Sequence, residues 1–427
     1  MDYEQLDNFY IGKKYDVQSK SLDKKSIILY DSKDLLTHLV CLGMTGSGKT
    51  GLCSVILEEA IIDNIPIICL DLKGDISNLL LTFPELSKED FLTWINKNEA
   101  SKKGISIEEY AELQSKFWKN GINEWDQDIS RIKKLRQATE FQIYTPGSNA
   151  GIPISILNSF SMPPKKILED KELMMDKIST TVTSLLDLLE INSDPLKSRE
   201  HILLSNIIKK SWENNEDLNL SKIIKYIQNP EIKKISVLDL ESFYPSEERF
   251  KLVMNINNLL ASSSFSSWME GQPLNIDNIL YNDQGKPRTS IFSIAHLSDK
   301  ERMFFVTLLL NYIISWMRSQ SGTTSLRAIL YIDEIFGYLP PTANPSSKKP
   351  LLTLLKQSRA FGLGIILATQ NPVDLDYKAL SNIGTWMIGR LQTERDKNRI
   401  LDGLDGISSK NSKMFDKKTL KNFIKFE

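Results

Sequence analysis

Gly43-Met44-Thr45-Gly46-Ser47-Gly48-Lys49-Thr50 is a complete phosphate-binding loop of the form G-x-x-x-x-G-K-[ST]. Its glycines let backbone N–H groups approach a triphosphate closely. Lys49 is placed to reach the β- and γ-phosphates, and the Thr50 hydroxyl is placed to bind Mg²⁺. We therefore predict that residues 43–51, ending at Gly51, bind a nucleoside triphosphate.

The segments on both sides of this loop support the prediction. Residues 38–42 form a short apolar run that is typical of a buried strand, and residues 51–62 have a helical pattern. A phosphate-binding loop requires this order of strand, loop and helix, because the amino end of the helix then faces the phosphates. The alternative, a glycine-rich turn without a ligand, does not account for the order.

Further apolar runs alternate with helical patterns and predict an α/β fold with a mainly parallel sheet. The expected strands lie at residues 65–71, 141–144, 290–294, 328–332, 364–368 and 385–389. Two long helical stretches separate them and indicate two helical insertions in the core. The first insertion carries Trp94, Trp118 and Trp125, which we expect to form its small core rather than a stacking platform for nucleic acid.

These patterns divide the chain into six consecutive parts. We expect a short N-terminal β segment at 1–37, the first part of the core at 38–81, a helical insertion at 82–137, a core strand and turn at 138–160, a second helical insertion at 161–284, and the second part of the core with a C-terminal helix, near 394–404, at 285–427.

Composition limits the possible classes of protein. The 427 residues are 41% hydrophobic and 25% charged, which is ordinary for a globular protein. The net charge of -1 provides no overall basic field, so any contact with nucleic acid depends on local patches. Cys41, Cys53 and Cys69 lie in apolar runs without C-x-x-C spacing, which predicts reduced core residues in a cytoplasmic protein rather than a zinc site.

No segment has the features of a secretion signal or a membrane span. The N-terminus is acidic and lacks an apolar signal region. The most apolar stretch, residues 303–317, carries Thr307, Asn311 and Ser315 at every fourth position, which makes one polar stripe on a helix. A membrane span needs about 20 nearly unbroken apolar residues, so we expect a buried core helix and no membrane partner.

Acidic and polar residues at two strand ends complete the predicted site. Asp333 ends an apolar run and is placed to hold, through a water molecule, the Mg²⁺ that Thr50 binds, while Glu334 is placed to orient and deprotonate the attacking water. Gln370 follows the next expected strand and can orient that water if the two strands are neighbours. A polar turn before Asn371-Pro372 is the alternative for Gln370.

Taken in order, these motifs resemble the HerA/FtsK superfamily of ring-forming ATPases, and most closely its HerA-like members. The resemblance is carried by residues 43–50, Asp71-Leu-Lys-Gly-Asp75, Asp333-Glu334, Lys356-Gln-Ser-Arg-Ala-Phe-Gly362 and Ala368-Thr-Gln-Asn-Pro372. It is firm over residues 26–81 and 288–404. The stretches before residue 38 and after residue 404 are shorter than the family pattern leads us to expect.

The resemblance implies a RecA-like sheet, a hexameric ring, ATP and Mg²⁺ bound between subunits, and translocation of double-stranded DNA. It also implies an arginine that acts in trans on the γ-phosphate. Arg359 matches the family pattern best and Arg390 is second, although either could form a structural ion pair.

Two functions share this predicted active site. One is a DNA-translocating, helicase-like motor. The other is a non-motor ATPase that assembles with or switches a partner protein, such as a nuclease or defence effector. A small-molecule kinase disagrees with Glu334 as a hydrolytic base, and an ABC-type ATPase requires an LSGGQ-like signature that the sequence lacks.

Overall fold

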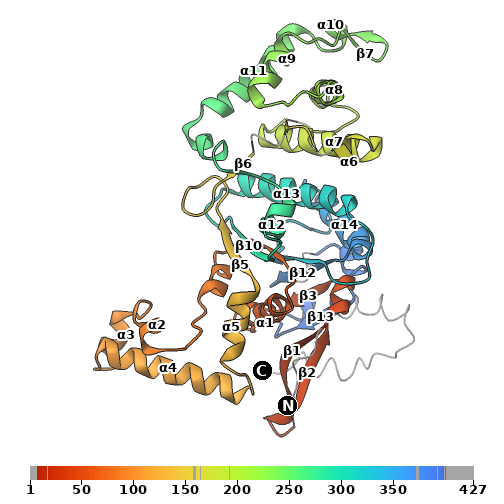
Figure 1. Cartoon of the computed structure of the whole chain (residues 1–427). Coiled ribbons are helices and arrows are strands. Elements are labelled where there is room, and N and C mark those ends of the chain that lie inside the picture. The colour runs from red at the N-terminus through yellow and green to blue at the C-terminus, as the bar shows by residue number, and fades with distance from the viewer. Residues whose placement is uncertain are drawn as a thin grey trace, which may run out of the picture.

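A parallel sheet forms the centre of the molecule. The computed structural model describes residues 7–16, 18–156, 160–163, 165–191, 193–371, 375–391, 393–398 and 400. Within these residues the sheet has seven strands, all parallel to their neighbours, in the order β13-β3-β12-β11-β4-β10-β5 (Figure 1). In chain order they are β3 (Leu39–Leu42), β4 (Ile67–Asp71), β5 (Glu140–Tyr144), β10 (Arg288–Ser293), β11 (Ala328–Asp333), β12 (Leu363–Thr369) and β13 (Thr385–Ile388). The predicted fold class is confirmed.

Both faces of the sheet are covered, which explains why its strands are nearly continuous apolar runs. One face packs against α1 (Lys49–Ile62), α5 (Ser130–Ala138) and the hairpin of β1 (Asn8–Asp16) and β2 (Ser21–Asp31). The other face packs against α12 (Ile276–Leu280), α13 (Asp299–Ser319) and α14 (Lys348–Gln357). Alternate residues of β4 therefore enter different cores: Ile67 and Cys69 face α1, whereas Ile68 and Leu70 face α13.

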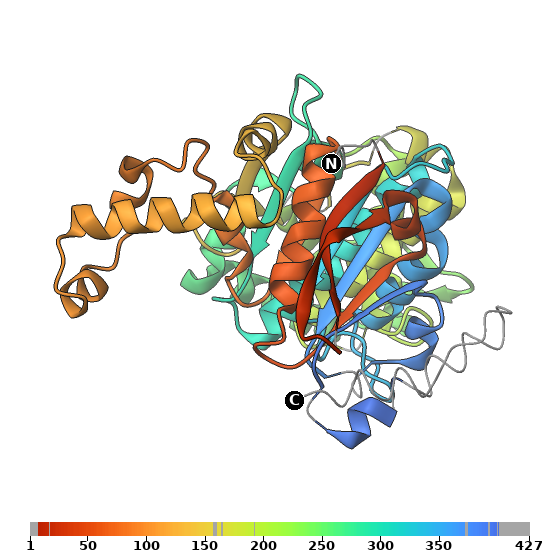
Figure 2. The same cartoon turned by 90° about the horizontal axis from the view of Figure 1, so that it is seen from below.

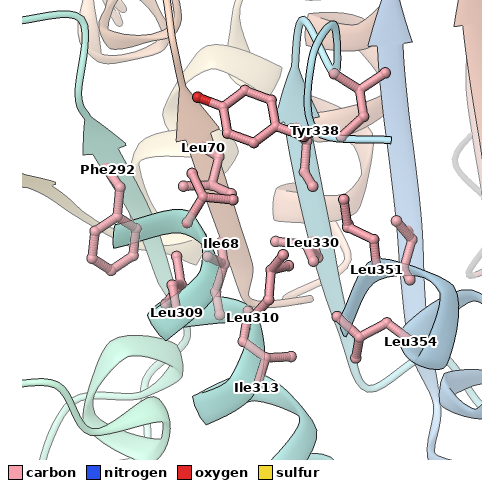
Figure 3. Close-up of a cluster of buried hydrophobic side chains, with 14 of the residues drawn as sticks. Ile68, Leu70, Phe292, Leu309, Leu310, Ile313, Leu330, Tyr338, Leu351 and Leu354 are labelled. Carbon is pink, nitrogen blue, oxygen red and sulfur yellow. The ribbon is translucent and has the colours of Figure 1, made fainter. Parts of the chain in front are cut away.

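The apolar stretch 303–317 lies in α13 and is part of the core. Leu310 and Ile313 point toward Ile68 and Leu330 of the sheet (Figure 3). Two residues of the polar stripe bond within the helix, because Thr307 and Ser315 each donate to the carbonyl four residues earlier. Across the described ranges, every helix is too short or too polar to cross a membrane.

The first insertion forms an arm that projects from the sheet (Figures 1 and 2). It contains α2 (Lys88–Leu92), α3 (Lys97–Lys102) and α4 (Ile107–Glu124) and leads into α5, whereas η2 (Ile76–Leu80) precedes it and packs in the core with α1. Its small core is Leu86, Phe91 and Ala111.

The prediction that three tryptophans form the core of this arm is wrong. The exposed fractions of Trp94, Trp118 and Trp125 are 61%, 51% and 41%. The buried residues of α4 are Tyr110, Ala111 and Ser115, all in its first half, and Trp118 comes after that half.

The second insertion is a helical module with its own hydrophobic core, to which Ile178, Leu204 and Trp212 belong. It contains α6 (Lys165–Leu168), α7 (Lys171–Leu188), α8 (Arg199–Glu213), α9 (Leu220–Gln228), α10 (Leu240–Phe243), α11 (Ser246–Ala261), β7 (Lys234–Ile235) and β8 (Leu238–Asp239). Helix α7 places the module against α13 (Figure 1).

The remaining short elements connect these parts. They are η1 (Ser32–Thr37), β6 (Ile154–Ser155), η4 (Ser263–Trp268), β9 (Gln272–Pro273), η5 (Ser358–Phe361) and α15 (Tyr377–Leu380). Of the C-terminal helix expected near 394–404, residues 394–398 are helical. Residues 399 and 401–404 lie outside the described ranges.

Replacing Lys177 by Met is expected to stabilise the protein by about 2 kcal/mol at pH 7. The Lys177 side chain is buried in α7 at the contact with α13, and burial lowers its pKa to about 7 from an unfolded value of 10.5. Its Nζ lies 3.1 Å from the centre of the Tyr312 ring, but one such contact offsets only part of the cost of burying an ammonium group.

The pH dependence of this effect follows from the sign of the shift. Between pH 7 and 10.5 the unfolded chain binds more protons at Lys177, so the wild-type protein gains stability as the pH rises. The advantage of Lys177→Met should therefore shrink across that window in urea denaturation. A variant that is less stable than wild type at pH 7 would show that the ring contact outweighs burial.

Candidate active site

The glycine-rich loop joins β3 to α1 at the carboxyl edge of the sheet. Backbone bonds hold it to two strand ends: Gly43 N donates to Thr369 O at 3.3 Å, and Met44 N donates to Arg390 O at 2.8 Å. A Cβ at Gly43 would lie 2.4 Å from Ser47 Oγ and 3.3 Å from the Cα of Gly389, so a side chain there would require the surrounding residues to shift. Gly48 has a φ of +86°, in the left-handed region that favours glycine.

The loop leaves the amino end of α1 open to an anion. Gly48 caps the helix without a side-chain hydrogen bond, and the first turn contains no acidic residue. Lys49 has no carboxylate partner among the described residues, and the Thr50 side chain is exposed. Free N–H groups, the helix dipole and an unpaired ammonium together make this a binding position for phosphate groups.

Asp333 lies at the carboxyl end of β11 and retains one unsatisfied oxygen. Tyr331 Oη donates to its Oδ1 at 2.8 Å, whereas its buried Oδ2 has no partner among the described residues. Burial raises the pKa of Asp333, while the Tyr331 bond and the charge of Lys73 oppose the rise. The described residues contain no group of three or more potential metal ligands. One such carboxylate oxygen suits a Mg²⁺ ion whose other ligands are Thr50, phosphates and water.

Glu334 accepts four hydrogen bonds from the ends of β12 and β4, the two strands that flank β11. Its Oε1 accepts from Thr369 Oγ1 at 3.0 Å and from Gln370 N at 3.3 Å. Its Oε2 accepts from Lys73 Nζ and from Gln370 Nε2, each at 2.9 Å. Burial on its own would raise the pKa of Glu334, but the bond and charge of Lys73, with the Thr369 and Gln370 bonds, hold that pKa below its ordinary value. The carboxylate is therefore ionised at neutral pH, which is the form that a general base requires.

The backbone of Glu334 is strained, since its φ of +64° is in the left-handed region. Glu334→Gly should relieve this strain, whereas Glu334→Ala removes the same side-chain bonds and retains it. We expect the glycine variant to be more stable than the alanine variant by about 1 kcal/mol. Equal urea midpoints for the two variants, measured without nucleotide, would contradict a strained backbone at this residue.

Gln370 connects Glu334 to the phosphate-binding loop. Strand β12, which ends at Thr369, is the neighbour of β11, so the condition set for Gln370 in the sequence is met. The Thr45 hydroxyl donates to Gln370 Oε1 at 2.6 Å, while the Nε2 of the same side chain donates to Glu334. The Gln370 side chain therefore connects the loop directly to the Glu334 carboxylate, and a displacement of Thr45 can reach that carboxylate through one residue.

Lys73 is a residue of the site that was not predicted from the sequence. It follows β4, which lies beside β11 with Asp71 opposite Asp333. The Asp71 carboxylate accepts from the backbone N–H groups of residues 73–76 and so fixes the turn that carries Lys73. The motif Asp71-Leu-Lys-Gly-Asp75 at a strand end could have pointed to Lys73, but the pairing of Lys73 with Glu334 depends on the strand order.

The two candidate arginines lie at opposite edges of the sheet. Arg390 follows β13, and its backbone bonds to Met44 place it beside the phosphate-binding loop of its own chain. Arg359 lies in η5, before β12, on the amino edge, and its side chain is exposed. The seven residues of β12, at about 3.3 Å each, separate it from that loop by roughly 20 Å. Arg359 cannot contact a nucleotide bound by its own chain.

A parallel sheet with a glycine-rich loop at its carboxyl edge, facing Asp333 and Glu334, defines a P-loop nucleoside triphosphatase. The family model described as "Helicase HerA, central domain" (DUF87) matches residues 18–313, which is more than half of the chain. The chain therefore belongs to that family, and it is an ATP-hydrolysing enzyme. The resemblance to the HerA/FtsK superfamily is confirmed.

Several solved structures match the chain, and that of a VirB4 protein has a similar fold. VirB4 of Thermoanaerobacter pseudethanolicus matches with a TM-score of 0.55 and 12% identity, over 98% of this chain and 91% of its own. The plasmid coupling protein TrwB in complex with an ATP analogue matches with a TM-score of 0.45 and 12% identity, over 87% of this chain and 70% of its own. TrwB in complex with ADP and Mg²⁺ matches with a TM-score of 0.44 and 12% identity, over 92% of this chain and 72% of its own. The curated proteins include no match to the sequence.

Proposed function

We propose that this protein is a ring motor of the HerA/FtsK type, in which ATP hydrolysis between subunits drives movement along double-stranded DNA. The separation of Arg359 from the phosphate-binding loop of its own chain carries the proposal. An exposed arginine at the amino edge can serve an active site only in a second copy of the chain. A closed ring supplies such a copy to every subunit.

Each residue of the site has a proposed role in hydrolysis. Residues 43–51 cradle the phosphates, Lys49 contacts the β- and γ-phosphates, and Thr50 and Asp333 hold Mg²⁺, which neutralises phosphate charge when bound. Glu334 accepts a proton from the attacking water, and Gln370 orients that water. Arg359 of the adjacent subunit stabilises the negative charge that develops on the γ-phosphate.

The DNA part of the proposal is supported by membership of the HerA central domain family. A net charge of -1 means that contacts with DNA must come from local basic residues in the ring rather than from an overall field. We propose a cytoplasmic location, which suits three buried, unpaired cysteines, and we treat segments 82–137 and 161–284 as separate modules on the core.

The alternative is a non-motor ATPase that switches a partner protein. The projecting arm favours it, because Leu113, Phe117 and Trp118 of α4 expose 50%, 68% and 51% of their surface. Exposed aromatic side chains are common where proteins bind one another. A nuclease or defence effector is the kind of partner that we propose in this case.

The two functions predict different responses of ATP hydrolysis to DNA. A motor should hydrolyse ATP at least about fivefold faster with saturating linear duplex, and the stimulation should fall steeply between 50 and 200 mM salt, since phosphate contacts release counterions. Single-stranded DNA of equal length is the control. A rate unchanged by duplex at any salt concentration would reject the motor and favour the partner-switching ATPase.

A further inference from the structure

The Glu334 carboxylate has no free position at which to accept a proton. An ionised carboxylate offers about four lone-pair sites, two on each oxygen. In this structure Thr369 and Gln370 N use those of Oε1, while Lys73 and Gln370 Nε2 use those of Oε2. A base in this arrangement cannot take a proton from water until one of the four donors leaves.

We propose that Lys73 is a positioning residue that holds Glu334 in a resting arrangement, from which occupation of the phosphate-binding loop releases it through Thr45 and Gln370. The inference rests on the proposed role of Glu334 as the base. It adds a control of that role by a residue to which no part in the reaction has been assigned.

Among the donors to Glu334, Lys73 holds the carboxylate most strongly, because its side chain is charged and because the turn that carries it is fixed. It is the only cation among the four donors, and a charge-assisted hydrogen bond is about twice as strong as a neutral one. The side chain of Glu334 is 16% exposed and that of Lys73 is 38% exposed, so solvent screens the pair only in part. Asp71 fixes the turn beneath Lys73, because four backbone N–H groups of that turn donate to its carboxylate.

The release path is a chain of two hydrogen bonds. Thr45 lies within the loop that phosphates occupy and donates to Gln370 Oε1 at 2.6 Å. The other end of the same amide donates to Glu334 Oε2, beside Lys73 Nζ. Any displacement of Thr45 frees Gln370 to turn, and that rotation removes a donor from the carboxylate and lets Glu334 move away from Lys73. The strained backbone of Glu334 adds a tendency to leave this arrangement.

The first test measures the nucleotide-free protein and needs no activity. Thermal midpoints are compared for wild type, Lys73→Met, Glu334→Gln and the double variant, with Lys116→Met on the arm as a matched surface control. We expect the two single effects to be clearly non-additive without nucleotide, and to become additive when a non-hydrolysable ATP analogue and Mg²⁺ are present. Additive effects without nucleotide, or coupling that the analogue leaves unchanged, would overturn the proposal.

The second test compares kcat and kcat/KM for ATP without DNA. Because Lys73 holds Glu334 only before the loop is occupied, Lys73→Met should raise kcat/KM about fivefold or more and leave kcat within about twofold of wild type. Lys73→Arg should restore the wild-type kcat/KM. A kcat/KM that does not rise, or a kcat that falls, would contradict a resting hold.

The two experiments distinguish a failure of the role of Lys73 from a failure of the proposed function. If Glu334→Gln hydrolyses ATP at the wild-type rate, Glu334 is not the base and the proposed function fails, whatever the thermal coupling with Lys73. If Glu334→Gln is inactive and the thermal effects are additive, the base assignment stands and only the role of Lys73 fails.

Discussion

Glu334→Gln is expected to lower kcat for ATP hydrolysis by at least about 100-fold, because the amide keeps the size of the side chain but cannot accept a proton from water. Glu334 contributes no predicted contact to the phosphates, so the affinity for ATP should stay within about threefold of wild type. Steady-state phosphate release gives kcat, and titration with a fluorescent ATP analogue gives the dissociation constant.

Two further variants make this result specific. Glu112→Gln, on the exposed face of α4, removes a carboxylate far from the site and should leave kcat unchanged. Asp333→Asn should weaken the dependence on Mg²⁺, since it alters the carboxylate proposed to hold the metal. Hydrolysis by Glu334→Gln within about twofold of wild type would remove Glu334 as the base and reopen the choice of catalytic residue.

Arg359→Ala is expected to reduce kcat by about 1000-fold, the scale on which a trans-acting arginine stabilises the transferring phosphoryl group. Nucleotide binding should persist, because the arginine lies at the sheet edge opposite the phosphate-binding loop. Mixing Arg359→Ala with Glu334→Gln subunits should restore activity, since some interfaces then combine an intact Glu334 with an intact Arg359.

Arg390 provides a matched control for this mixing experiment. Its backbone bonds to Met44, so its side chain belongs to the same site as its own Glu334. Mixing Arg390→Ala with Glu334→Gln should therefore give no more activity than the Arg390→Ala subunits supply alone, at any ratio. Recovery with the Arg390 mixture and none with the Arg359 mixture would reverse the two assignments.

The parts of the site that depend on local chemistry could be predicted from the sequence. The glycine-rich loop was predicted because its residue types and spacing are specific, and the parallel sheet because strands buried on both faces are short apolar runs. Asp333 and Glu334 were found because they directly follow such a run. These inferences required no knowledge of which strands are neighbours.

The remaining features depend on strand order and on packing across the chain. Lys73 meets Glu334 because β4 lies beside β11, although 261 residues separate them in sequence. The arginines could not be ranked by position until the sheet placed one at each edge. The tryptophans were misplaced because aromatic content indicates a core only where a partner helix is long enough to cover it.

Movement along duplex DNA is the most direct test of the central claim. The assay presents a short third strand bound as a triplex at one end of a linear duplex and follows its release after ATP is added. We predict displacement by the wild-type protein that slows as the duplex is lengthened, and none by Glu334→Gln. Rapid ATP hydrolysis with no displacement on any duplex length would contradict a DNA motor.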